Sequence, residues 1–257
     1  QAWAVCRPDF CPTITADENQ QIVEGRNSSL KEIKEKLGWV ASALGEFGEK
    51  ELTYNYRNTR EIARFANFFY DNLETTPPNL PKKSSGVIPR YYNFNNIREQ
   101  AIRIVRYKKE HPKKTIGVLV APLKSSFLRK QITEAIRDVI DSFSDKDIQM
   151  ECLQQYASRP EDLAAGVSKN LDFSSEGKIT VLTRQSSKGL EFDTVFLTGL
   201  ESVKVGSDIN LTKRNLYVLS TRARNELFLF SNNNINTLPQ VMTEDFFKEI
   251  ISSDAVN

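Results

Sequence analysis

The sequence predicts an α/β fold in which a mostly parallel sheet carries helices on both faces. From about residue 87 onward, short apolar segments alternate with segments of helical periodicity, which is the pattern of parallel strands joined by helices. The 257 residues are 39% hydrophobic and 26% charged, the composition of an ordinary globular protein. No internal repeat or low-complexity tract interrupts the pattern. The chain is long enough for one large domain or two small ones.

The first seventy residues predict two strands and two helices. Residues 13–16 form a short apolar segment that ends at a polar loop, and 52–56 are also strand-like. A helix over 30–37 is expected because Ser29 and Glu32 have capping-box spacing and Gly38 follows. A second helix is expected after Asn58, the predicted cap, with Glu61 three residues on. Its predicted core face is Ile62, Phe65, Ala66 and Phe69.

The remainder of the chain predicts the regular part of the sheet. Residues 75–86, rich in proline, serine and glycine, form a surface linker. Strands are then predicted at 87–94, 115–121, 148–153, 179–183, 194–199 and 226–230, and 156–178 is loop-like. Helices are predicted at 96–110, 126–140, 211–222 and 243–252. The predicted core face of the first is Ile97, Ala101, Ile104 and Val105. That of the second is Leu128, Ile132, Ile136, Val139 and Ile140.

Composition excludes several functional classes. No apolar run reaches membrane-spanning length, and the N-terminus has no secretory signal, so we expect no membrane partner and a cytoplasmic location. Cys6, Cys11 and Cys152 are read as free thiols of a reducing compartment. The only histidine is His111, which leaves little support for a hydrolase triad or a metal site. The net charge is only +2, so any surface for nucleic acid must be local. The basic stretch 98–114 is read as a solvated helix face.

Four separated segments carry motif-like patterns. They are Thr15-Ala-Asp-Glu-Asn-Gln-Gln-Ile22, Asn55-Tyr-Arg-Asn58, residues 181–197 with Lys188-Gly-Leu-Glu191, and residues 216–224 with Ser220-Thr-Arg-Ala223. The third segment is a polar loop between two strands, and loops at strand ends are where open α/β sheets hold phosphorylated ligands. One such pattern is a modest signal, whereas four in a fixed order are specific.

In this order, the four segments resemble motifs of the superfamily 1 DNA helicases of the UvrD/Rep/PcrA type. The resemblance implies a RecA-like three-layer αβα domain over 50–235. Residues 1–49 would be the tail end of a first RecA-like domain, and 236–257 would form a C-terminal helical tail. The match covers nearly the whole chain, although 71–178 matches only in its α/β rhythm.

The resemblance implies roles around ATP for the two N-terminal segments. Arg57 would contact the γ-phosphate, which suits a planar guanidinium at a loop end. Tyr56 would stack on the adenine, and Gln20 would sense the γ-phosphate through its amide. From the residues alone, Arg57 could instead bridge a carboxylate, Tyr56 could belong to the core, and Gln20 could be a solvated loop residue.

The two C-terminal segments would complete that nucleotide site. Arg222 resembles the arginine finger that stabilises charge on the transferred phosphoryl group. Glu191 would accept a ribose hydroxyl, and Gly189 would permit a positive φ or close approach of the backbone. The alternatives are a structural arginine at a helix C-terminus and a salt bridge between Glu191 and Lys188 or another base.

Nucleic-acid contacts are assigned to the same loop. Thr183, Gln185, Ser187 and Lys188, with Ser186, would contact a nucleic-acid backbone. Two positions depart from the family pattern. Gln185 stands where the family has histidine, and Gly25 replaces an aromatic that stacks on a base, a contact that Arg26 would only partly replace. Stacking of this kind is worth about 1–3 kcal/mol per base.

Two ATPase motifs are missing from the sequence. It contains no Gly-x-x-x-x-Gly-Lys-Ser/Thr phosphate loop and no Asp-Glu-x-x-Gln magnesium box, and it begins at Gln1. We therefore expect a fragment that holds half of an ATP site, with ATP and Mg²⁺ bound only in the complete enzyme. The expected partners are an upstream first RecA-like domain and single-stranded or duplex-junction DNA.

The sequence thus predicts the C-terminal motor half of a superfamily 1 helicase or translocase, which would be inactive as an ATPase by itself. By resemblance, its direction would be 3′ to 5′. The alternative is a motor-dead module that binds nucleic acid or docks a partner, which Gln185 and Gly25 favour. A third possibility is the ATPase subunit of an anti-phage nuclease pair.

Overall fold

The computed structural model describes residues 53–70, 77–122, 125–143, 152–156, 177–203, 209–232 and 252–253, together with the exposed helical positions Glu32 and Glu35. The strand predicted at 13–16, most of the helix at 30–37, and Gln20, Gly25 and Arg26 lie outside these residues. The α-helices are α2 (Arg60–Asn67), α3 (Ile97–Glu110), α4 (Ser126–Ser142) and α6 (Ile209–Ser220). The strands are β1 (Arg90–Phe94), β2 (Ile116–Val120), β3 (Leu153–Tyr156), β4 (Ile179–Thr183), β5 (Phe192–Thr198), β6 (Ala223–Asn232) and β7 (Ser252–Ser253).

The strands form one sheet in the order β3-β4-β2-β5-β6-β1-β7, and every pairing is parallel. Val120 at the end of β2 lies level with Thr183 of β4 and Thr198 of β5. At the opposite edge, Phe192 of β5 lies level with Ala223 of β6. The two edges of the sheet are therefore defined residue by residue, which fixes where each loop emerges.

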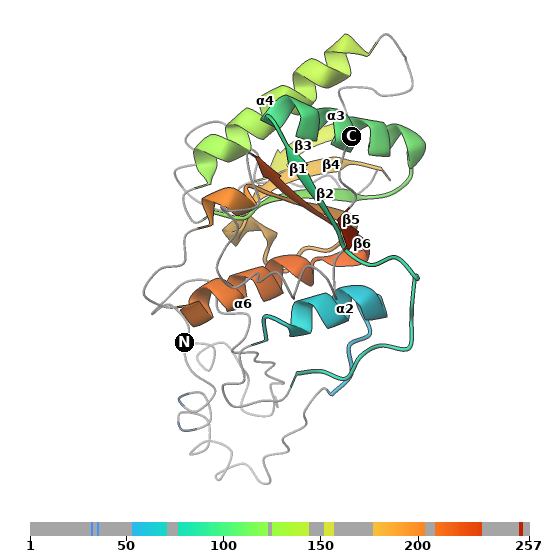
Figure 1. Ribbon diagram of the computed structural model, residues 1–257, viewed down its shortest axis with the longest axis vertical. Helices are drawn as coiled ribbons and strands as arrows, with labels where there is room; N and C mark the ends of the chain where they lie inside the picture. The colour runs from blue at the N-terminus through green and yellow to red at the C-terminus, as the bar shows by residue number, and fades with distance from the viewer. Residues whose placement is uncertain are drawn as a thin grey trace, which may run out of the picture.

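Helices cover both faces of this sheet (Figure 1). α3 and α4 lie on one face, and α2 and α6 lie on the other. β2 and β4, in the interior of the sheet, are buried at every position, as expected for parallel strands covered on both sides. The predicted three-layer α/β fold is confirmed.

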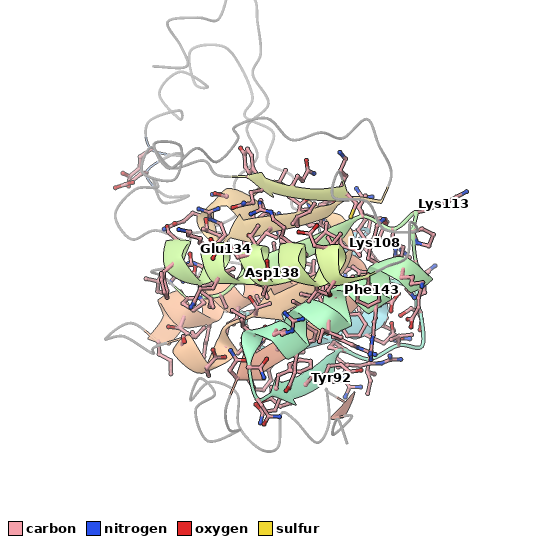
Figure 2. The ribbon with its side chains drawn as sticks, turned by 90° about the horizontal axis from the view of Figure 1, so that it is seen from above. Tyr92, Lys108, Lys113, Glu134, Asp138 and Phe143 are labelled. Atoms are coloured by element: carbon pink, nitrogen blue, oxygen red, sulfur yellow. The ribbon has the colours of Figure 1, made fainter. Side chains whose placement is uncertain are left out.

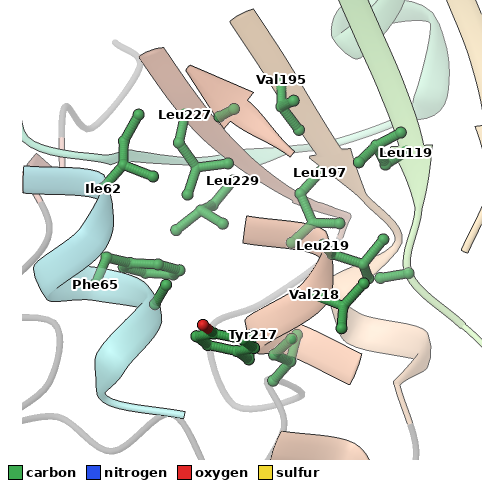
Figure 3. Close-up of a cluster of buried hydrophobic side chains, with 14 of the residues drawn as sticks. Ile62, Phe65, Leu119, Val195, Leu197, Tyr217, Val218, Leu219, Leu227 and Leu229 are labelled. Carbon is green, nitrogen blue, oxygen red and sulfur yellow. The ribbon is translucent and has the colours of Figure 1, made fainter. Parts of the chain in front are cut away.

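Each face has its own apolar core. Under α2 and α6, Phe65 and Tyr217 pack with Leu227 and Leu229 of β6 (Figure 3). The predicted core face of α2 is correct, since Ile62, Phe65, Ala66 and Phe69 are all buried. On the other face, Ile104 of α3 and Ile132 of α4 pack on alternate residues of the same strands. Figure 2 looks down onto this second layer.

Helix α3 begins as predicted, whereas α2 does not. Asn96 accepts a hydrogen bond from the Glu99 N–H at 3.0 Å, which caps α3. Asn58 was expected to cap α2, but Thr59 occupies the N-cap position and makes no side-chain cap. Asn58 is engaged with distant backbone instead. The expected partner Glu61 accepts hydrogen bonds from Ser84, Ser85 and Gly86, which fastens the linker to α2.

Several strand boundaries differ from expectation. The expected strand at 52–56 is reduced, within 53–56, to a single bridge between Tyr54 and Asn79. β3 starts at Leu153, where the predicted strand ended. β6 extends from Ala223 to Asn232, because the bonds to β5 and β1 continue beyond the apolar run. Ser252 and Ser253 pair with β1 as a short strand, where the end of a helix was expected.

Two lysines of the basic stretch 98–114, Lys108 and Lys114, make hydrogen bonds within the fold. Lys114 donates to Glu226 and to the Tyr107 hydroxyl, and the Lys108 ammonium donates to the Pro112 carbonyl oxygen. Burial lowers the pKa of Lys108. The solvated reading is therefore wrong for these two lysines, which stabilise the fold. Among the described helices, none is long and apolar enough to cross a membrane.

Candidate functional site

The structure joins two of the motif segments directly. The buried Asn58 amide donates to the carbonyl oxygens of Thr221, at 3.1 Å, and of Ala223. The Thr59 N–H donates to the Arg224 carbonyl at 3.0 Å. Segment 55–58 is thus fastened to the turn between α6 and β6, although more than 160 residues separate them in the sequence.

Asn55 shapes the backbone on which Tyr56 and Arg57 stand. Its side-chain oxygen accepts from the N–H groups of Arg57 at 3.0 Å and Asn58 at 3.2 Å, and its amide donates to Asn58 at 2.9 Å. This local turn leaves the Tyr56 side chain 87% exposed, so Tyr56 does not belong to the core. The ring of Tyr54 lies near it, with a centroid distance of 5.9 Å.

A carboxylate lies between two arginines at this point. Glu191 pairs with Arg57 through one oxygen and with Arg224, at 3.2 Å, through the other. Arg57 therefore bridges a carboxylate, and Glu191 pairs with these two arginines. All three side chains are partly exposed, so the pairs are screened by water. An anionic ligand could compete with Glu191 for either guanidinium.

Arg222 is placed differently, because its side chain is buried within its own domain. The guanidinium donates to the carbonyl oxygen of Val218 at 2.9 Å, to Thr221 at 3.2 Å and to the carbonyl oxygen of Leu190 at 3.4 Å. It therefore joins the end of α6 to the loop before β5. The alternative of a structural arginine at a helix C-terminus describes this arrangement.

Gly189 adopts the positive φ that the sequence suggested. Its φ is +84°, a region that residues with a Cβ rarely occupy. A Cβ placed there would meet no atom within 4 Å. Conformation, rather than close approach within this domain, accounts for glycine at this position.

These residues lie at the amino edge of the sheet. Glu191 immediately precedes β5, Arg222 immediately precedes β6, and the Phe192 N–H donates to the Arg222 carbonyl at 2.9 Å. The expectation of a ligand loop at strand ends followed the rule for open α/β sheets, which places ligands at the carboxyl ends. This arginine-rich cluster departs from that rule.

The residues assigned to nucleic acid begin at the carboxyl edge. Thr183 ends β4 and lies level with Thr198, seven residues beyond Glu191, or about 20 Å along a strand. Thr183 and Ser187 are buried, and they donate to Ser186 at 3.1 Å and to the Arg184 carbonyl at 2.7 Å. Gln185 is partly buried, and Lys188 is exposed. The loop 184–191 thus runs from one edge of the sheet to the other.

The structure adds Asn55, Asn58 and Arg224 to the predicted set. Arg224 stood beside Arg222 in the motif, but its pairing with Glu191 depends on the alignment of β5 and β6. No pattern in the sequence indicates that Asn58 binds the α6–β6 turn. Within the described residues, no group of three or more His, Cys, Asp or Glu side chains could hold a metal ion.

Comparison with known proteins agrees with the family resemblance. Residues 124–234 match the family model described as the UvrD-like helicase C-terminal domain. The fold is similar to the crystal structure of the C-terminal domain of a possible DNA helicase from Lactobacillus plantarum WCFS1, with a TM-score of 0.51 and 16% identity, over 78% of this chain and 99% of that chain. No curated protein matches the chain.

Proposed function

Because residues 124–234 match the family model of the UvrD-like helicase C-terminal domain, we propose that the chain is the C-terminal motor half of an ATP-dependent superfamily 1 DNA helicase or translocase. The observation that carries the proposal is the meeting of three motif segments at the amino edge of the sheet, where Arg57, Glu191 and Arg224 form one cluster. ATP would lie between this edge and an upstream RecA-like domain. The chain contains no phosphate loop, so it would supply one wall of that site.

The exposed cluster suits the nucleotide. Tyr56 would stack on the adenine, which its 87% exposure allows. Arg57 would exchange Glu191 for the γ-phosphate, and Glu191 would then accept the ribose hydroxyl. Gly189 would give the backbone its turn beside that carboxylate. In the complete enzyme Mg²⁺ would be held with the phosphates, and Gln20 would sense the γ-phosphate.

The arginine finger role of Arg222 requires a rearrangement. In the structure its guanidinium faces three acceptors of its own domain and is only 1% exposed. To reach a phosphoryl group it would have to leave the Val218 and Leu190 carbonyls as the two domains close. Otherwise it would act by holding Glu191 in place through the neighbouring Leu190.

Single-stranded or duplex-junction DNA would lie along the carboxyl edge. Thr183 ends β4 at this edge, and Gln185, Ser187 and Lys188 belong to the loop that joins the edge to the nucleotide cluster. A change in nucleotide contacts at Glu191 could therefore shift the DNA-facing end of the same loop. This coupling is what a translocase requires.

The test is Mg²⁺-dependent ATP turnover of the complete protein in the presence of single-stranded DNA. Arg57→Ala should lower turnover at least about 100-fold, given the 10³–10⁵ range that a phosphate-facing arginine supplies. Arg64→Ala, an exposed arginine on α2, is the matched control. Near-normal turnover of Arg57→Ala would refute the proposal, as would robust ATPase activity of the present chain alone.

The burial of Arg222 favours a second candidate, the motor-dead module. In that case the complete protein would bind nucleic acid with an affinity that ATP leaves unchanged. Arg222→Lys separates the candidates because lysine can still donate to the buried carbonyls. A large loss of turnover with normal stability supports the motor, whereas absent turnover in the wild type supports the module. The cytoplasmic location stays a prediction.

A further inference from the structure

The linker that precedes β1 lies along the motif segment that precedes α2. The Asn79 N–H donates to the Thr53 carbonyl at 2.7 Å, and the Asn79 carbonyl accepts from the Asn55 N–H at 3.3 Å. Further along the linker, the Lys83 carbonyl accepts from the Arg60 N–H at 2.7 Å. The linker is therefore bound to the chain on both sides of the two exposed residues, a tyrosine and an arginine, that are proposed to contact the nucleotide.

The side chain of Lys83 extends from the linker to the start of β6. Its ammonium donates to the Asn225 side-chain oxygen at 2.7 Å. Asn225 follows Arg224 directly, and the Arg224 carbonyl accepts from the Thr59 N–H at 3.0 Å. The ammonium thus lies at the amino edge of the sheet, bound to the residue next to one of the two arginines that share Glu191.

This ammonium has two unused N–H groups. A lysine carries three donors, and within the described residues the neutral Asn225 oxygen is the only polar partner of this one. The Glu61 carboxylate, which accepts from the next three linker residues, forms no ion pair with it in this part of the structure. These hydrogen bonds hold the linker beside α2, so the charge of Lys83 is positioned without being neutralised.

We propose that the Lys83 ammonium binds a phosphate group of the nucleotide, alongside Arg57 and Arg224. The two guanidinium groups share the single carboxylate of Glu191, so a third cation gives this edge an excess of positive charge that an anionic ligand would balance. A lysine ammonium binds phosphate oxygens as a point charge, and it can do so with the two donors that Asn225 leaves. The inference rests on the proposed function for the presence of a nucleotide at this edge, and it adds the linker to the site.

The test measures equilibrium binding of Mg²⁺-ATP and of adenosine to the complete protein by calorimetry. Adenosine has the same base and ribose but no phosphate, so its affinity does not depend on a phosphate contact. Lys83→Ala should raise the Kd for ATP about 5- to 30-fold, the loss expected for one charge-assisted hydrogen bond at a solvent-exposed site. The Kd for adenosine should not change. Lys82→Ala removes the neighbouring exposed lysine and should bind both ligands like the wild type.

A second variant separates the charge from support of the linker. Lys83→Gln can keep a donor for Asn225 but has no charge, so it should lose as much ATP affinity as Lys83→Ala. Both variants should keep the urea unfolding midpoint of the wild type, since the side chain is exposed. If Lys83→Gln binds ATP like the wild type, or if Lys83→Ala weakens adenosine and ATP equally, the side chain acts by supporting the linker, and the phosphate contact is wrong.

The remaining outcomes distinguish this inference from the proposed function. If the wild type binds ATP and Lys83→Ala binds it equally well, Lys83 has no such role, and the Arg57→Ala turnover test still decides the motor. If the wild type binds ATP without hydrolysing it, the motor fails, and the comparison of affinities still decides the inference. If the wild type binds no ATP, both are wrong. If Lys83→Ala lowers turnover at unchanged ATP affinity, the ammonium contacts the upstream domain instead, and the inference fails.

Discussion

Replacing Asn58 with alanine should separate two motif segments that the fold joins. The Asn58 amide donates to the carbonyls of Thr221 and Ala223, and its oxygen accepts from Asn55. Alanine removes all three hydrogen bonds. The two carbonyls belong to buried residues on either side of Arg222, so water replaces the amide poorly. Asn55 is less affected because its partly exposed amide can turn to water.

The magnitude follows from these contacts. A hydrogen bond contributes about 0.5–1.5 kcal/mol net, and a buried group left unpaired costs about 1–3 kcal/mol. Two buried bonds and one half-buried bond therefore give a loss of about 2–4 kcal/mol in the free energy of unfolding. With a urea m-value of about 2 kcal/mol/M, the unfolding midpoint should fall by about 1–2 M.

The assay is equilibrium urea unfolding of the chain, followed by circular dichroism. Asn67→Ala is the matched control, since Asn67 is a partly buried asparagine on α2 whose amide makes one 3.3 Å bond to the Pro78 carbonyl. It should change stability by less than about 1 kcal/mol. If Asn58→Ala is no more destabilising than Asn67→Ala, the hydrogen bonds to the α6–β6 turn do not hold the site together.

Two further predictions concern the loops that frame the site. Gly189→Ala should lower the free energy of unfolding by about 1–2 kcal/mol, because φ is +84° and no steric clash adds to the backbone cost. Thermal unfolding measures this loss. A loss above about 4 kcal/mol would contradict the open space around the added Cβ. For Glu61, burial alone would raise the pKa, but hydrogen bonds from Ser84 and from the Ser85 and Gly86 N–H groups lower it from 4.5 to about 2. Because the folded pKa is depressed, this carboxylate stabilises the fold above about pH 4.5, and the contribution is lost as the pH falls toward 2. Urea unfolding from pH 6 to pH 2 should show a steeper loss of stability for the wild type than for Glu61→Gln, by about 1 kcal/mol after solvent screening; parallel curves would show that Glu61 does not hold the linker.

Local patterns predicted the elements whose interactions are themselves local. The apolar spacing in α2, α3 and α4 is set by the 3.6-residue period, and Asn96 caps α3 through Glu99, three residues away. β2 and β4 were found because their apolar runs are buried on both faces. The prediction of a strand at 52–56 failed for its described part, 53–56, because within the described residues this segment pairs through an isolated bridge between Tyr54 and Asn79 and is not a strand of the sheet.

The candidate site shows the same division. Its motif residues were readable because Asn55-Tyr-Arg-Asn58, Lys188-Gly-Leu-Glu191 and Ser220-Thr-Arg-Ala223 are short patterns in a fixed order. The sequence did not predict which residues these motif residues contact. Asn58 looked like a helix cap because Glu61 follows at the right spacing, yet the nearby carbonyls of the α6–β6 turn take its amide instead.

By itself, the sequence determined the α/β class, most helices and central strands, and the family resemblance, since each depends on residues near one another in the chain. Only the tertiary structure decided that Glu191 lies between Arg57 and Arg224, that Arg222 is buried, and that Thr183 lies at the opposite edge of the sheet. These facts depend on the order and register of parallel strands, which are set by packing across the whole core. The loop 184–191, which is one continuous polar segment in the sequence, therefore runs from one edge of the sheet to the other.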